Sequence, residues 1–159
     1  MIPLALILAA AATHQISLPD IVSHDLPTVH HKSGVPVLLP SKAPASGDVA
    51  TIHGTGFGRR THYSFTFFYG DTCGANACSL GFVSGQKGGR PAFTATVKLR
   101  GGRTGYYKPL TCGGSCSPPE VEWVQRGVLY SIQWGDVTRS GARKAMIGLA
   151  NSAIAAGAR

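Results

Sequence analysis

The stretch VEWVQRGVLYSIQW, residues 121–134, decides the fold. Both halves are rich in β-branched and aromatic residues, which favour strands, and the QRG between them supplies a glycine for a tight turn. We expect Val121–Val124 and Val128–Trp134 to pair as an antiparallel hairpin. Side chains alternate along a strand, so Tyr130, Ile132 and Trp134 share one face, which we expect to form the core.

The segment after this hairpin predicts a helix over residues 138–156. Its apolar side chains recur mostly at steps of three and four residues, and Thr138 or Ser140 can cap its start. These apolar residues are Ala142, Ala145, Met146, Leu149, Ala150, Ile154 and Ala155. A sheet with one apolar face needs a cover, and a helix bearing Leu149 and Ile154 is the expected partner of the hairpin.

Upstream of the hairpin, most of the chain has the pattern of short strands. Candidate strands cover residues 49–53, 62–69, 79–84, 93–100 and 104–107. The glycine-rich GTGFG at 54–58 predicts a turn or bulge, and Gly101 with Gly102 can supply the positive φ angles of a tight hairpin.

The region before residue 48 predicts little regular structure. Residues 17–32 contain Pro19 and Pro27, which limit them to one or two short helical turns, and residues 34–40 predict an edge strand or an extended segment. The expected fold class is therefore α+β, a mainly antiparallel β-sheet covered by a C-terminal α-helix, with a short N-terminal helical segment.

The 159 residues suit one domain, and the first twelve differ from the rest. Residues 1–12, MIPLALILAAAA, are an apolar run closed by small residues, which predicts a signal peptide and export to the periplasm or the outside of the cell. A buried helix or a start codon further upstream are the alternatives, because no Lys or Arg precedes the run. Residues 13–159 form the expected α+β domain, and we expect no transmembrane segment, because the run is too short to span a bilayer.

The four cysteines form two close pairs, Cys73 with Cys78 and Cys112 with Cys116. In an oxidising compartment an even set of cysteines usually forms disulfides, and each pair encloses a loop with glycine that can close locally. We therefore predict two local disulfides. The alternative is a four-thiolate zinc site, in which the two pairs converge in space and stabilise a small binding module.

Positive charge is the broadest signal in the sequence, whose formal net charge is +8. No acidic residue lies between Asp71 and Glu120, and we single out the basic residues around the Gly101–Gly102 turn as an anion-binding site. These residues are Lys98, Arg100, Arg103 and Lys108. The expected partner is an acidic polymer or an anionic envelope surface, with no specific nucleic acid, and a solvated hairpin that only keeps the protein soluble is the alternative.

The sequence contains few of the motifs that indicate catalytic residues. No G-x-S-x-G motif is present, GTGFGRR at 54–60 has neither nucleotide-binding spacing, and the histidines show no metal-ligand pattern. Glu120 and Glu122 lie two apart on a strand and share a face, either as a carboxylate pair or as solvent-facing side chains. We expect a monomeric binding or structural domain without catalytic residues, metal or cofactor. The rival is a hydrolase whose serine and histidine meet only in the fold.

Several segments together resemble a group of exported bacterial proteins of unknown function. They are GVPVLLPSKAP, CGANAC, TGYYKPLTCGGSC and VEWVQRGVLYSIQW, followed by a C-terminal helix containing LANSA. In that group a proline-bracketed run precedes an antiparallel sheet, a W-x-x-x-G-x-x-Y hairpin closes it and a helix follows; Trp123, Gly127 and Tyr130 match the hairpin. The resemblance covers about Val35 to Ala156 and implies the compartment and the fold.

Overall fold

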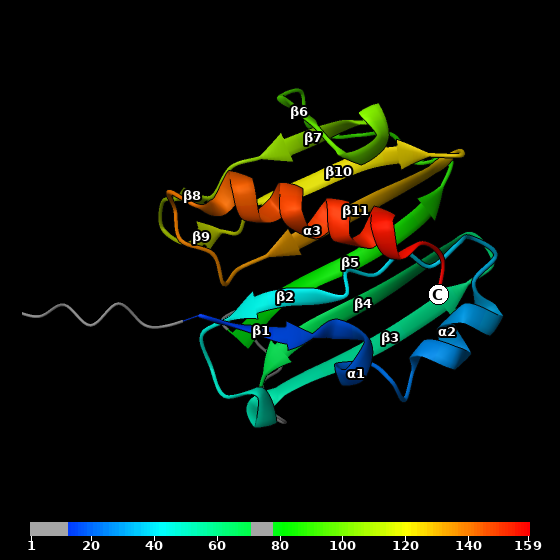
Figure 1. Cartoon of the computed structure of the whole chain (residues 1–159), viewed down its shortest axis with the longest axis horizontal. Coiled ribbons are helices and arrows are strands. Elements are labelled where there is room, and N and C mark those ends of the chain that lie inside the picture. The colour runs from blue at the N-terminus through cyan, green and yellow to red at the C-terminus, as the bar shows by residue number, and fades with distance from the viewer. Residues whose placement is uncertain (1–12, 71–77) are drawn as a thin grey trace, which may run out of the picture.

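A seven-stranded antiparallel sheet forms the body of the protein in its computed structural model, which describes residues 13–70 and 78–159 (Figure 1). The predicted signal peptide, residues 1–12, lies outside the described residues. The strand order across the sheet is β3-β4-β5-β11-β10-β7-β6. The strands are β3 (Ile52–Arg59), β4 (His62–Tyr69), β5 (Ser79–Lys87), β6 (Thr96–Lys98), β7 (Thr104–Lys108), β10 (Glu120–Gln125) and β11 (Val128–Trp134).

One face of this sheet carries a second layer, which Figure 1 shows in front of the strands. The long helix α3 (Ala142–Ala156) packs on β10 and β11. Beside it lies a two-stranded ribbon of β1 (His14–Ser17) and β2 (Lys42–Ala45), and the short helices α1 (Leu18–Ile21) and α2 (Leu26–Lys32) cover β3. The predicted α+β class, with a C-terminal helix covering an antiparallel sheet, is confirmed.

The final hairpin supplies much of the core. Tyr130, Ile132 and Trp134 are almost fully buried on the covered face, as predicted, and Trp123 on β10 stacks on Tyr130 with ring centroids 5.4 Å apart. Four of the seven apolar residues predicted for the buried side of α3 are buried there, namely Ala142, Met146, Leu149 and Ala150. Ala145 and Ile154 are half-buried and Ala155 is exposed, whereas Ala153, which was not predicted, is buried. Aromatic rings packed in this way bury a large apolar area, which drives the helix onto the sheet.

The predicted turn at GTGFG is wrong, because these residues lie inside β3. A short 3₁₀ helix, η1 (Val49–Thr51), precedes the strand. Gly54, Gly56 and Gly58 alternate along the covered face, where α1 and α2 approach so closely that side chains would collide; a Cβ on Gly58 would lie 2.8 Å from the backbone oxygen of Val29. The glycines therefore make room for the helices instead of turning the chain.

The strand predicted over residues 93–100 is much shorter, because only Thr96–Lys98 forms β6. The residues before β6 lie over the other face of the sheet, where the Ala92 N–H donates to the Glu122 carboxylate at 2.7 Å. Residues 34–40 are the extended segment that the sequence predicts, and Leu38 pairs with Ala158 just after α3. Pro27 stands in the first turn of α2, where its missing N–H costs no hydrogen bond.

Candidate anion-binding surface

The antiparallel order brings four chain segments to the same end of the sheet. These are the β3–β4 turn, the end of β5, the β10–β11 turn and the β6–β7 turn. Backbone hydrogen bonds join neighbouring segments of this set. The Lys87 N–H at the end of β5 donates to the Thr61 carbonyl of the β3–β4 turn, and the Gly88 N–H donates to the Gly127 carbonyl of the β10–β11 turn, both at 2.8 Å. Side chains that are far apart in sequence therefore stand side by side here.

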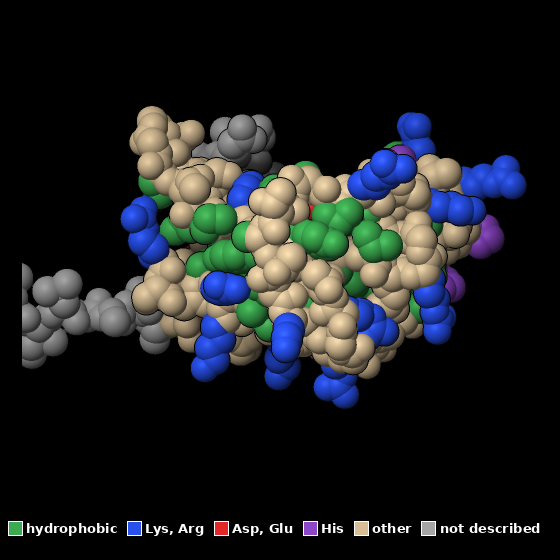
Figure 2. All heavy atoms as spheres, turned by 90° about the horizontal axis from the view of Figure 1, so that it is seen from above, with side chains coloured by type: hydrophobic (Ala, Val, Ile, Leu, Met, Phe, Trp, Pro, Cys, Tyr) green, Lys and Arg blue, Asp and Glu red, His purple; other side chains and the backbone are tan. Residues whose placement is uncertain are grey.

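Seven cations lie in these segments, and together we call them the basic end. They are Arg59, Arg60, Lys87, Lys98, Arg100, Arg103 and Arg126. All are exposed except Arg103, which is half-buried. None of the Asp and Glu residues that the structure describes lies in these four segments. Figure 2 shows Lys, Arg and His side chains at the right-hand end of the molecule, where Figure 1 places the β3–β4 and β10–β11 turns, and further Lys and Arg side chains along the lower edge and at the left.

Three of the four residues that the sequence predicts as an anion site belong to this basic end. Lys98 ends β6, and Arg100 and Arg103 flank the glycine pair, whose φ angles of 70° and 72° are positive as predicted. The Arg103 guanidinium donates to the Arg100 carbonyl at 2.8 Å, and the Arg100 N–H donates to Asn151 of α3 at 2.6 Å. The turn is therefore fixed on the helix with its charges toward solvent.

The fourth residue, Lys108, lies at the opposite end of β7. Its ammonium group pairs with the Glu120 carboxylate at 3.3 Å and lies 5.6 Å from the centroid of the Phe93 ring. The register places Lys108 directly opposite Glu120 on the neighbouring strand. Its charge is thereby neutralised within the fold, so Lys108 is separate from the basic end.

Glu120 and Glu122 share one face of β10, as the sequence predicts, but both are buried rather than solvent-facing. Glu120 accepts hydrogen bonds from Ser131 at 2.6 Å and from Gln133 at 3.3 Å, besides its contact with Lys108. Burial raises the pKa of Glu122, although the Ala92 N–H bond stabilises the charged form. Both carboxylates hold chain segments together, and among the described residues neither pairs with a cation of the basic end.

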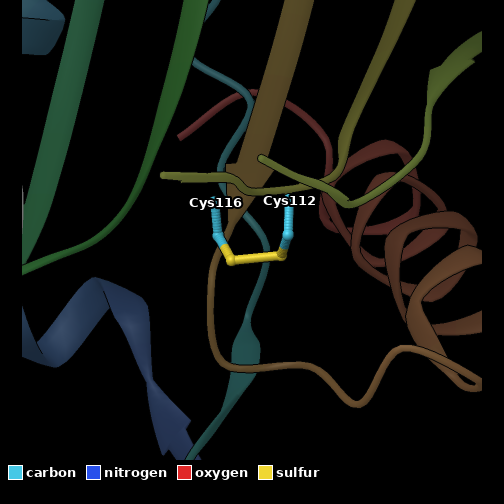
Figure 3. Close-up of a disulfide and its surroundings, with 2 residues drawn as sticks. All are labelled: Cys112 and Cys116. Carbon is cyan, nitrogen blue, oxygen red and sulfur yellow. A yellow bond between two sulfur atoms is a disulfide. The ribbon is translucent and has the colours of Figure 1, made fainter. Parts of the chain in front are cut away.

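The disulfide predicted between Cys112 and Cys116 is present (Figure 3). The two residues face each other in a small ladder of β8 (Thr111–Cys112) and β9 (Cys116–Ser117), with Cα atoms 4.1 Å apart. A four-thiolate zinc site would need both as thiolates, so this bond disagrees with that alternative. The pairing of Cys73 with Cys78 stays a prediction, because residue 73 lies outside the described residues.

The hydrolase alternative requires a serine hydroxyl placed beside catalytic partners, and two serine hydroxyls contact carboxylates. Ser46 donates to Asp136 at 2.9 Å, and Ser131 donates to Glu120. Tyr69 also donates to Asp136. A serine nucleophile needs a base such as histidine beside it, and neither of these two contacts includes one. Over residues 13–70 and 78–159, no group of three or more His, Cys, Asp and Glu side chains is placed to hold a metal ion.

Comparisons with protein-family models, with curated proteins and with solved structures found no match for this chain. In the part of the chain that the structure describes, no helix is both long enough and apolar enough to cross a membrane.

Sequence reasoning missed four members of the basic end, Arg59, Arg60, Lys87 and Arg126. Each stands in a turn or at a strand end, and only the antiparallel order of the strands brings them together. The signal was present in principle, because alternate turns of an antiparallel sheet lie at the same end. The sequence analysis already placed Arg59 and Arg60 between two predicted strands, but it did not derive the order of the strands and so did not bring them next to the other cations.

Proposed function

We propose that the protein is an exported, non-catalytic domain that binds acidic polymers through the basic end. The observation that carries the proposal is the placement of exposed cations in four neighbouring segments without a carboxylate among the described residues there. Such a single-sign surface concentrates polyanions near it, and more strongly at low salt.

The arrangement of the charges favours a polymer over a small ion. Strands in a sheet lie about 4.8 Å apart, so the ends of seven strands extend over about 30 Å. Along that line the chain presents Arg59, Lys87, Arg126, Arg103 and Lys98 in the order of their strands. A linear polyanion that lies across the strand ends can contact several of these cations at once, and the many weak contacts add up.

The test is elution from immobilised heparin in a salt gradient, with three variants that each lose three positive charges. One variant changes the β3–β4, β5 and β10–β11 cations, as Arg59→Ser, Lys87→Ser and Arg126→Asn. The second changes the β6–β7 turn, as Lys98→Ser, Arg100→Ser and Arg103→Ser. The control changes exposed cations elsewhere, as Lys42→Ser, Arg139→Ser and Lys144→Ser.

We expect both variants of the basic end to elute at clearly lower salt than the native protein and the control. The logarithm of the binding constant should also depend less steeply on the logarithm of the salt concentration, by about one unit for each ion pair with the polymer that a substitution removes. If all three variants elute together, binding follows net charge alone and the basic end is not a binding site.

A further inference from the structure

A cavity of about 230 Å³ opens beside the β10–β11 turn, at the basic end. Its apolar walls are Pro36 and Leu38 of the extended segment and Ala158 after α3, and its polar groups come from Gln125, Arg126 and Tyr130. Ligand sites combine apolar walls with a few polar groups in this way, and the volume suits a ligand smaller than a typical drug.

Gln125, one of the residues that line this cavity, carries an unpaired acceptor. Its side-chain oxygen Oε1 is buried and has no hydrogen-bond partner among the residues that the structure describes. Buried polar atoms in folded proteins are nearly always paired, because an unpaired one loses its bond to water without replacement. A ligand that fits this position should therefore present an O–H or N–H donor to Gln125.

Arg126 holds its place at a conformational cost. Its φ angle is +52° and that of Gly127 is +75°, the combination of a tight hairpin turn in which Asn-Gly is the preferred pair. The left-handed conformation is unfavourable for arginine, so the turn would be more stable with another residue at this position. Strain of this kind is common at binding sites, where it fixes the position of a side chain.

Arg126 and Tyr130 both line the cavity. Burial raises the pKa of Tyr130 to about 12, and the positive charge of Arg126 opposes that rise. The Tyr130 hydroxyl donates to the Pro36 carbonyl at 3.1 Å, which leaves its oxygen able to accept from a ligand. The residues that line the cavity thus include one cation and two side chains with acceptor oxygens.

We propose that this cavity binds a small carboxylic acid that carries neutral hydroxyl donors, and that its natural ligand is a uronate unit of an acidic polysaccharide. A carboxylate pairs with a guanidinium through charge-assisted hydrogen bonds. Sugar hydroxyls can donate to Gln125 and Tyr130, while the apolar side of the ring lies against Pro36 and Leu38. The assignment to a polymer unit rests on the function proposed above; the binding of the free acid does not.

Other anions fit the same groups less well. An amino acid brings an ammonium donor, which Arg126 and the positive surface around it would repel. A phosphodiester offers acceptors alone and leaves Gln125 Oε1 unpaired. The combination of an anion with neutral donors therefore selects acidic sugars over amino acids and nucleic acid backbones.

The test is a titration of the full protein with glucuronate, followed by NMR on ¹⁵N-labelled protein, with glucose as the neutral analogue. Glucuronate should shift the backbone resonances of residues 125–130 and 157–158, and glucose should bind at least tenfold more weakly. Arg126→Asn should weaken glucuronate binding at least tenfold, whereas Lys144→Ser should leave it unchanged.

Two variants separate a binding role from a folding role. Asn suits the turn better than Arg, so Arg126→Asn should unfold at a higher urea concentration than the native protein while it binds glucuronate less. Gln125→Met removes the buried unpaired oxygen and should keep or raise the unfolding midpoint while it weakens binding.

The outcomes distinguish this proposal from the function proposed above. If heparin binds at the basic end but glucuronate produces no shifts around the cavity, the cavity proposal is wrong and polymer binding stands. If glucuronate binds while polymers do not, the binding of the free acid stands, whereas the polymer function and the assignment of the ligand to a polymer unit are both wrong. Equal binding of glucose and glucuronate would remove Arg126 as the anion partner and overturn the proposal.

Discussion

The Tyr63 hydroxyl ties the extended segment 34–40 to the sheet. It donates to the Leu38 carbonyl at 2.8 Å and accepts from the Leu38 N–H at 2.9 Å, so one side chain satisfies both backbone groups of a buried residue. Tyr63 itself is fully buried, and burial raises the pKa of its phenol well above the usual range. The bridge between Leu38 and Ala158 includes the hydrogen bond from the Arg159 N–H to the Val37 carbonyl, so Tyr63 satisfies the backbone groups of Leu38 itself.

We predict that Tyr63→Phe lowers the free energy of unfolding by about 2 to 4 kcal/mol, because the N–H and the carbonyl of Leu38 both lose their partner in a buried place. Urea denaturation measures this change. Tyr106→Phe is the matched control, since the structure assigns its hydroxyl no hydrogen bond within residues 13–70 and 78–159, and it should change stability little. A Tyr63→Phe effect as small as that of the control would contradict the assigned role.

At the scale of elements, the glycines of β3 decide where α1 and α2 can lie. Gly54 would place a Cβ 2.6 Å from Val22, and Gly58 would place one 2.8 Å from the backbone of Val29. The Gly56 N–H donates to the Asp25 carboxylate at 2.7 Å, which fixes the start of α2 against the edge of the sheet. The absence of side chains along this face of β3 therefore allows a helix to pack directly on a strand.

Gly58→Ala tests this close approach. The new methyl group meets backbone atoms that cannot rotate away, so we expect a decrease of about 1 to 3 kcal/mol in the free energy of unfolding. Thr55→Val is the control on the exposed face of the same strand, where a β-branched residue suits the strand and the change should stay within about 0.5 kcal/mol. Thermal or urea unfolding of the two variants compares them, and equal stabilities would contradict the packing described here.

The elements that were predicted from sequence share a strong local pattern. Aromatic and β-branched residues mark β4 and β11 with their observed bounds, and helical spacing marks α3, because each pattern repeats over several residues. The failures have a different cause. In both failures, residues far away in sequence set the local conformation. The glycines of GTGFG pack against Val29, and Ala92, just before residues 93–95, is bound to Glu122. Local pattern carries no information about such partners.

At the scale of the whole molecule, the fold brings seven of the fifteen Lys and Arg residues together at the basic end. Asp48 and Asp136 lie near the opposite ends of the strands, before β3 and after β11. Sequence analysis found the acid-free segment and three of the cations at this end, but it also included Lys108, which Glu120 neutralises. The cavity beside Arg126 was not predictable, since its walls come from three segments that meet only in the fold.

The central claim is that acidic polymers bind at the basic end. The most direct measurement is the titration of ¹⁵N-labelled protein with a short heparin oligosaccharide, with the backbone amide resonances followed by NMR. We predict that the largest shifts occur at residues 59–61, 87–88, 100–103 and 126–127, and that they diminish as salt is added. Largest shifts around Asp48, Asp136 or the start of α3, or uniform small shifts over the whole surface, would contradict the claim.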